Sequence, residues 1–247
     1  ILNISREKLL ITEREVSGEE IKKFKLLISR RESYEPIAYI TNKKEFRSQN
    51  FFVDRKSLIP RPETELLIDP IKKIFNKKNL FFLDIGVGTG CIISSILKEM
   101  VHSRGIGVDI CKSTIFNAKA NLSSLKVGNR AKILCRSFQD IFNYKFDLIV
   151  SNPPYIKSKD IKNLSEDIKK FEPRMALDGG NDGLDLIKKI IYKSNHILKV
   201  NGLLALEIGN EQVIKVSKKL KENNFRIKDY LKDYKDNIRC VIAIKNK

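Results

Sequence analysis

The chain of 247 residues carries 48 lysines and arginines against 30 aspartates and glutamates, which gives a formal net charge of +18. The 42% hydrophobic share is typical of a globular protein, and no apolar run reaches the roughly 18 residues that would span a membrane. Four scattered cysteines and two histidines lack the spacing of a disulfide framework or a metal site, so neither is predicted. Paired lysines such as Lys72-Lys73 lie on helix-like stretches and are interpreted as solvated faces, so the charge alone does not indicate a nucleic-acid partner.

The first 33 residues are polar and helix-prone. Ser17 and Glu20 have the spacing of a capping box. The apolar residues that follow fall on one helical face, at Ile21, Phe24, Leu27 and Ile28. We predict a small helical lobe over residues 1–33, then a linker over residues 34–62 that contains a β-hairpin with strands at 45–46 and 50–53.

From residue 63 onward, short apolar runs alternate with helix-like stretches. The expected strands are 80–85, 105–109, 131–135, 146–151, 202–208, 227–231 and 239–244. The expected helices are 63–75, 91–100, 113–126, 184–198 and 211–223. This alternation predicts a Rossmann-like α/β domain over residues 63–247, with a mostly parallel, doubly wound sheet that binds its ligand at the carboxyl ends of the strands.

A glycine-rich loop joins the first of these strands to its helix. Glycines at alternate positions let the backbone turn tightly and approach a ligand closely. The spacing is GxGxG, whereas dinucleotide folds use GxGxxG. Asp84 at the strand end would repel a phosphate and suits a ligand with an amine or a positive charge. The predicted ligand-binding residues here are Asp84, Gly86, Val87, Gly88, Thr89 and Gly90.

Asp109 ends the next strand, where a carboxylate can accept hydrogen bonds from both hydroxyls of a ribose. The alternative is an N-cap for the helix that begins near Ser113. Together with the glycine loop, Asp109 indicates an adenosyl ligand that has a positive centre and no pyrophosphate. S-adenosylmethionine fits that description.

The strand 146–151 ends in the tetrapeptide Asn152-Pro153-Pro154-Tyr155. Two prolines cannot continue a central strand, so the chain leaves it in a stiff, extended loop. The Asn152 side-chain oxygen and the Pro153 carbonyl are acceptors for a planar group with an NH2, and Tyr155 can cover its face. The alternative is a strand terminator with a packed tyrosine.

Several longer segments accompany these motifs, in the same order as in one known family. They are DIGVGTG (84–90), SNPPY (151–155), EPIAYI (35–40), LIPRPETE (58–65), FEPRMALDGGNDGLD (171–185) and LEIG (206–209). From about Tyr34 onward the chain resembles class I methyltransferases, and among them the HemK/PrmC group. The resemblance implies methyl transfer from S-adenosylmethionine to the side-chain amide nitrogen N5 of the glutamine in the GGQ loop of class I peptide-chain release factors, which supports translation termination. It also implies that S-adenosylhomocysteine is the product and that the last strand is antiparallel.

The resemblance further implies roles for residues outside the glycine loop. Asn152 is expected to contact the cofactor as well as the substrate. Phe138 is the expected aromatic against the adenine, with core packing as the alternative. Arg61, Glu63 and Glu172 are expected to hold the NPPY loop and the substrate, with an ion pair of purely structural role as the alternative.

The family usually has a longer helical N-terminal domain, so we expect the lobe over residues 1–33 to be truncated. We also expect a cytoplasmic monomer with no stable nucleic-acid partner and no membrane association. A second hypothesis is a nucleic-acid amino-methyltransferase that acts on adenine N6, cytosine N4 or guanine N2, because such enzymes share the NPPY tetrapeptide. A third is an S-adenosylmethionine-binding module without catalytic activity.

Overall fold

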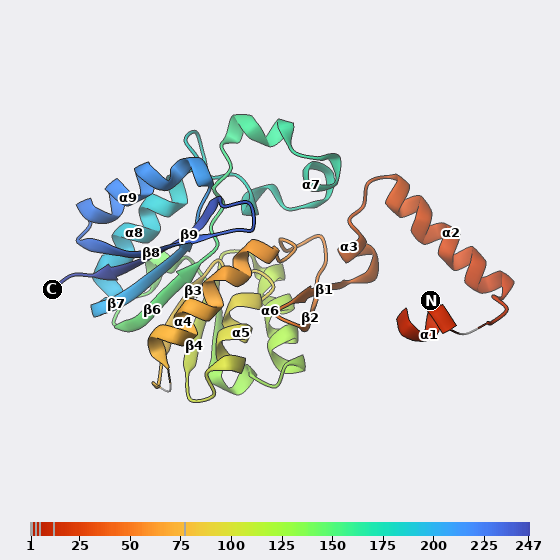
Figure 1. The fold of residues 1–247 in the computed structure, drawn as a ribbon, viewed down its shortest axis with the longest axis horizontal. Helices are drawn as coiled ribbons and strands as arrows, with labels where there is room; N and C mark the ends of the chain where they lie inside the picture. Colours follow the sequence, from red (N-terminus) through yellow and green to blue (C-terminus); the bar gives the residue numbers. More distant parts are fainter. Residues whose placement is uncertain (1, 3, 5, 12, 77) are drawn as a thin grey trace.

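The protein was analysed as a computed structural model, which describes residues 2, 4, 6–11, 13–76 and 78–247. Its centre is a seven-stranded sheet with the strand order β5-β4-β3-β6-β7-β9-β8 (Figure 1). The strands are β3 (Phe81–Ile85), β4 (Arg104–Asp109), β5 (Ala131–Cys135), β6 (Phe146–Ser151), β7 (Leu198–Glu207), β8 (Phe225–Lys232) and β9 (Ile238–Lys245).

Strands β3 to β7 pair in parallel, and β9 runs antiparallel to both β7 and β8. The Rossmann-like class and the antiparallel last strand are thereby confirmed. The strand order reverses between β3 and β6, since β4 and β5 continue to one side and β7 to the other. In open parallel sheets ligands bind outside the carboxyl ends of the strands at such a reversal, so the ligand site is expected at the carboxyl ends of β3 and β6.

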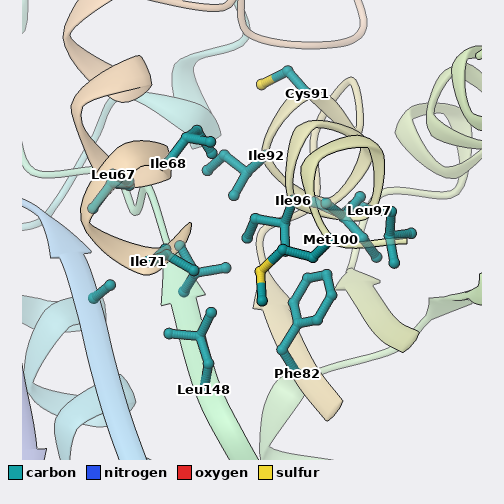
Figure 2. Packing of buried hydrophobic residues seen from close by; sticks show 14 of the residues in the cluster. Leu67, Ile68, Ile71, Phe82, Cys91, Ile92, Ile96, Leu97, Met100 and Leu148 are labelled. Atoms are coloured by element: carbon teal, nitrogen blue, oxygen red, sulfur yellow. The ribbon is translucent and has the colours of Figure 1, made fainter. Parts of the chain in front are cut away.

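Helices cover both faces of the sheet (Figure 1). The main helices are α4 (Ile68–Phe75), α5 (Cys91–Glu99), α6 (Lys112–Ser124), α8 (Asp185–Ile197) and α9 (Val213–Glu222). Two apolar clusters result, one beneath α4, α5 and α6 and the other beneath α8 and α9. In the first cluster Ile71 of α4 and Ile96 of α5 converge on Phe82 and Leu148 of the sheet (Figure 2). Burial of such side chains contributes roughly 1.5–3 kcal/mol each and holds the strand ends in register.

The helix predicted over residues 63–75 is divided in the structure. A 3₁₀ segment, η1 (Pro62–Leu67), precedes α4. Pro70 has no N–H to donate to the carbonyl of Leu66, so a continuous α-helix through this region would lack one of its hydrogen bonds.

No helix or strand was predicted between residues 156 and 172. The structure has a 3₁₀ segment there, η4 (Ser158–Asn163), and a short helix, α7 (Glu166–Phe171).

The N-terminal region contains α1 (Arg6–Ile11) and α2 (Gly18–Glu32), which extends away from the sheet (Figure 1). The predicted capping box between Ser17 and Glu20 is present. The predicted apolar face of α2 is mostly exposed, and Phe24 is 56% exposed. The buried carboxylate of Glu35 accepts hydrogen bonds from Arg30 and Arg55, which connects α2 to the linker. The division into regions 1–33, 34–62 and 63–247 stays a prediction.

The linker contains α3 (Ile37–Thr41) and the predicted hairpin, whose strands are β1 (Lys43–Phe46) and β2 (Gln49–Phe52). Asn121 of α6 fastens this hairpin to the sheet domain. Its side-chain oxygen accepts from the Phe52 N–H at 2.7 Å, and its Nδ2 donates to the carbonyls of Phe52 at 3.0 Å and Thr89 at 2.9 Å. One buried side chain thus connects the hairpin, α6 and the glycine loop.

Within the described part of the chain, no helix is long and apolar enough to cross a membrane, and no group of three or more metal-ligating side chains is gathered.

Candidate active site

The glycine loop leaves β3 and returns directly into α5. Gly86, Gly88 and Gly90 have φ angles of 74°, 53° and 79°, a region that side chains with a Cβ rarely adopt. The N–H groups of Gly86 and Val87 both donate to the Val108 carbonyl, at 2.9 and 3.0 Å, which fixes the loop against β4. A Cβ on Gly86 would meet no atom within 4 Å, so this side of the loop is open.

Asp109 lies at the carboxyl end of β4, beside the glycine loop. Its Oδ2 accepts from the Gly88 N–H at 3.1 Å and its Oδ1 from the Cys111 N–H at 2.9 Å. Burial raises the pKa of the Asp109 carboxyl, and the backbone hydrogen bonds partly oppose that rise. Each carboxylate oxygen can accept more than one hydrogen bond, so Asp109 is held in place and still able to accept from a ligand.

Asp84 is fully buried at the end of β3. Its Oδ2 accepts from the Ile93 N–H of α5 at 3.1 Å, while its Oδ1 has no hydrogen-bond partner among the described residues. Burial raises the pKa of its carboxyl to about 7. Asp84 thus fastens the first turn of α5 to the end of β3.

A cavity of about 340 Å³ lies over the carboxyl ends of β3, β4 and β6. Its walls bring together nine of the residues predicted for the site, which are Arg61, Gly86, Val87, Gly88, Thr89, Asp109, Phe138, Asn152 and Pro154. Among the described residues, the remaining predicted residues lie outside its lining, namely Glu63, Asp84, Gly90, Pro153, Tyr155 and Glu172. The glycine loop and the NPPY loop, which are far apart in sequence, therefore meet at one cavity, which Thr89 and Asn152 both line.

Asn152 sits where β6 ends, and one end of its side chain is fixed. Its Nδ2 donates to the Thr64 hydroxyl at 3.0 Å, and that hydroxyl in turn donates to Glu207 Oε2 at 2.5 Å. No donor within the described part of the chain bonds to Asn152 Oδ1 or to the Pro153 carbonyl. Both acceptors are therefore without a partner among the described residues; Asn152 lines the cavity, and Pro153 is buried between the two lining residues Asn152 and Pro154.

The loop after Pro154 is clamped by the segment around Gly183. The Ile156 N–H donates to the Leu177 carbonyl at 3.0 Å, and Gln212 Nε2 donates to the carbonyls of Tyr155 at 2.8 Å and Gly183 at 3.1 Å. Gly183 has a φ of 75°, and a Cβ there would come within 2.4 Å of the Tyr155 carbonyl oxygen. The glycine allows the close backbone approach that keeps the NPPY loop in place.

Tyr155 turns its hydroxyl towards Glu207, donating to Oε1 at 3.2 Å, and its ring packs against the apolar cluster beneath α8 and α9. Burial raises the pKa of its phenol well above the usual range.

Arg61 and Glu172 form an ion pair across 111 residues of sequence. The Arg61 guanidinium lines the cavity, whereas the Glu172 carboxylate is buried and also accepts from the Ile59 N–H. Glu63 is half-buried, and its negative charge helps to raise the pKa of Glu207. The predicted substrate roles of these three residues stay predictions.

Phe138 lines the cavity and also belongs to the apolar cluster beneath α8 and α9, so its ring contacts both. Its two predicted roles, at an adenine and in the core, are compatible.

Sequence reasoning missed the parts played by Thr64, Glu207 and Gln212. Thr64 and Glu207 lie inside the segments LIPRPETE and LEIG, yet neither was singled out as a site residue. One signal was available for Glu207, because a carboxylate at the carboxyl end of an apolar parallel strand lies at the ligand-binding edge of the sheet.

The sheet order, the glycine loop and Asp109 beside the cavity define the class I methyltransferase fold. A solved structure with this fold, the T. thermophilus 16S rRNA N2 G1207 methyltransferase in complex with AdoMet and guanosine, superposes with a TM-score of 0.58 at 15% identity, covering 83% of this chain and 50% of that one. Residues 62–180 match the family Methyltransferase small domain, and residues 1–41 match the family PrmC N-terminal domain.

Whole-chain relatives narrow the assignment. The release factor glutamine methyltransferase of Buchnera aphidicola subsp. Schizaphis graminum is 39% identical over 246 residues, covering 99% of this chain and 89% of that protein. The release factor glutamine methyltransferase of Caulobacter vibrioides is 34% identical over 235 residues, covering 94% and 81%. The chain belongs to the release factor glutamine methyltransferase family, which confirms the resemblance to the HemK/PrmC group.

Proposed function

We propose that this protein transfers a methyl group from S-adenosylmethionine to the N5 amide nitrogen of the glutamine in the GGQ loop of class I release factors. The observation that carries the proposal is the pair of free acceptors, Asn152 Oδ1 and the Pro153 carbonyl, beside a cavity bounded by the glycine loop. A primary carboxamide presents two N–H donors in one plane, which matches this pair. The names of the relatives support the choice of substrate.

The residues around the cavity fit S-adenosylmethionine. The open side of Gly86 and Gly88 leaves room for a ligand against the backbone, Asp109 offers a carboxylate for ribose hydroxyls, and Phe138 offers an apolar face for the adenine. When bound there, S-adenosylmethionine supplies a methyl group on a positively charged sulfur. The AdoMet complex of the structural neighbour supports the same cofactor in this fold.

The chain's own residues have to compensate for the weak nucleophilicity of an amide nitrogen, whose lone pair is delocalised into the carbonyl. Asn152 Oδ1 and the Pro153 carbonyl accept its two N–H bonds and hold the nitrogen in one orientation. Positive charge develops on the nitrogen during transfer, and acceptors fixed there in advance stabilise it. No general base is needed, because the proton can leave after the transfer. Among the described residues no histidine lines the cavity.

The proposal includes a cytoplasmic monomer that meets the release factor transiently and has no stable nucleic-acid partner. Arg61 in the linker, Glu63 in η1 and Glu172 after α7 are proposed to contact or support the protein substrate. Arg61 lines the cavity and pairs with Glu172.

A tritium-methyl transfer assay tests the proposal, with release factor, DNA and tRNA offered side by side. We expect label in release factor, and none after its GGQ glutamine is replaced by alanine. Label found only in nucleic acid would refute the proposal in favour of an amino-methyltransferase acting on bases. Cofactor binding without label in any of the three would favour a module without catalytic activity.

Asn152→Ala is the matched test of the acceptor role. Because the variant removes Oδ1 and leaves the glycine loop intact, turnover should be abolished while affinity for S-adenosylmethionine stays within about tenfold, or roughly 1.4 kcal/mol. Calorimetric titration with the cofactor and single-turnover transfer measure the two quantities separately. Intact turnover in this variant would show that Asn152 does not dock the amide.

A further inference from the structure

Behind the acceptor pair lies a buried chain of polar groups that no catalytic step described above uses. It runs from Asn152 Nδ2 to the Thr64 hydroxyl and on to the Glu207 carboxylate. Thr64 and Glu207 are 2% and 1% exposed. They come from η1 and the end of β7, which are 143 residues apart in sequence. Such a pair has to be hydrogen-bonded to be tolerated in the interior, and here the bonds have a direction.

The direction follows from the donor and acceptor capacities of the three groups. An ionised carboxylate accepts only, so the Thr64 hydroxyl has to donate its single hydrogen to Glu207. Thr64 then has only lone pairs to offer to Asn152, and the Asn152 amide must turn its NH2 to Thr64. Its oxygen is thereby left for the substrate.

We propose that Glu207, acting through Thr64, is a positioning residue that selects the orientation of the Asn152 side-chain amide and so keeps the substrate acceptor facing the glutamine. The proposal rests on the proposed function and deepens it. The amide of asparagine is nearly symmetric in shape, and packing alone does not distinguish its two ends. A flipped Asn152 would present NH2 to the NH2 of the substrate, and two donors cannot bond. The fixed polarity of the chain Glu207–Thr64–Asn152 excludes that state.

The surroundings of Glu207 place the change of its charge near neutral pH. Burial raises the pKa of its carboxyl to about 7, although the hydrogen bonds from Thr64 and Tyr155 oppose the rise. The titratable or charged groups that face it are Glu63 from η1, Cys91 from α5, Tyr155 from the NPPY loop, and Arg239 and Cys240 from β9. Glu63 favours the protonated form of Glu207 and Arg239 the ionised form.

Protonation of Glu207 would reverse the direction of the hydrogen bonds that join Glu207, Thr64 and Asn152. A carboxyl that carries its proton on Oε2 donates to Thr64, the Thr64 hydrogen turns to Asn152, and the Asn152 oxygen is drawn away from the substrate. Turnover is therefore expected to fall as the pH falls through the pKa of Glu207. The fall of kcat at low pH is the acid limb of the pH profile. The amide nitrogen of glutamine does not titrate in this range, so the acid limb reports a group of the enzyme. Asp84, whose pKa is also about 7, is the competing source of such a limb.

The test uses three variants of the full chain, Thr64→Val, Thr64→Ser and Glu207→Gln, with release factor as substrate. Thr64→Val keeps the shape of the side chain and removes the hydroxyl, so kcat should fall about 10- to 100-fold while KM for release factor and the affinity for S-adenosylhomocysteine change less than about threefold. Thr64→Ser restores the hydroxyl and should return kcat to within about threefold of the wild type. Ser217→Ala serves as the control with unchanged kcat. It removes a partly buried hydroxyl of α9 that hydrogen-bonds to the Tyr230 hydroxyl of β8, away from the cavity lining.

Glu207→Gln supplies the readout that a merely structural role would not move. A carboxamide cannot ionise, so the fall of kcat at the acid end of the wild-type pH profile, between about pH 5.5 and pH 9, should be absent in this variant. Retention of the wild-type limb in Glu207→Gln, or of wild-type kcat in Thr64→Val, refutes the positioning role alone. Failure of the wild-type enzyme to label release factor refutes the proposed function and the positioning role with it. Unchanged S-adenosylhomocysteine binding shows that each variant is folded.

Discussion

The glycine that presses against the NPPY loop offers a quantitative test of how that loop is held. Gly183 has a φ of 75°, and a Cβ added there would lie 2.4 Å from the Tyr155 carbonyl oxygen and 2.5 Å from Gln212 Nε2. Both atoms take part in the clamp, since Gln212 Nε2 donates to the Tyr155 and Gly183 carbonyls. Gly183→Ala therefore strains the backbone and pushes the clamp apart in one step.

The expected loss can be estimated from these contacts. A left-handed conformation costs an L-residue about 1–2 kcal/mol. Loss of the two Gln212 hydrogen bonds adds about 0.5–1.5 kcal/mol each. The free energy of unfolding should fall by roughly 2–5 kcal/mol, and kcat should fall further than stability alone explains, because the Asn152 and Pro153 acceptors shift with the loop.

Urea denaturation followed by far-UV ellipticity measures the first quantity, and methyl transfer under conditions where the variant is folded measures the second. Gly18→Ala is the control, because a Cβ on Gly18 at the start of α2 meets nothing within 4 Å. If Gly183→Ala unfolds at the same urea concentration as Gly18→Ala and turns over as the wild type does, the clamp does not hold the loop.

Two further predictions concern the cofactor and the linker. Asp109→Ala should weaken S-adenosylmethionine binding about 10- to 100-fold, since hydrogen bonds to a charged group contribute about 1.5–3 kcal/mol; calorimetric titration measures this, and unchanged affinity would remove Asp109 from the site. The hydrogen bonds from Arg30 lower the pKa of Glu35 from 4.5 to about 2. Its ionised form therefore stabilises the fold above pH 4.5, and the stability difference between wild type and Glu35→Gln should shrink as the pH falls towards 2, which acid-dependent urea denaturation can follow. A difference that is constant over that range would contradict it.

Local sequence signals were sufficient to predict most of the sheet. The apolar runs that became β3 to β6 are short and bounded by turn residues, which favours strands over helices. β7 begins at Leu198, four residues before the predicted start at residue 202, because α8 passes directly into the strand without a turn residue between them. The boundary carried no signal.

The short helix α7 and the long-range hydrogen bonds were not predicted from the sequence. α7 has six residues and no buried one, so it shows no apolar periodicity, although Ser165 followed by Glu166 and Asp167 is a helix-start signal that could have been used. The bond between Thr64 and Glu207 joins residues 143 positions apart, and only the folded sheet brings them together. Motif spacing located the cavity, whereas the support behind Asn152 depends on tertiary structure.

The three hydrogen bonds of Asn121 hold two separate segments to α6. Because a single amide bonds both the Phe52 backbone and the Thr89 carbonyl, loss of the Asn121 side chain would release the hairpin and the cofactor loop from α6 together. Upstream of the hairpin, Tyr34 has a φ of 72°, and the neighbouring Glu35 accepts hydrogen bonds from Arg30 of α2 and Arg55 of the linker. The contacts that hold α2 to the linker are therefore separate from those that hold the cofactor loop.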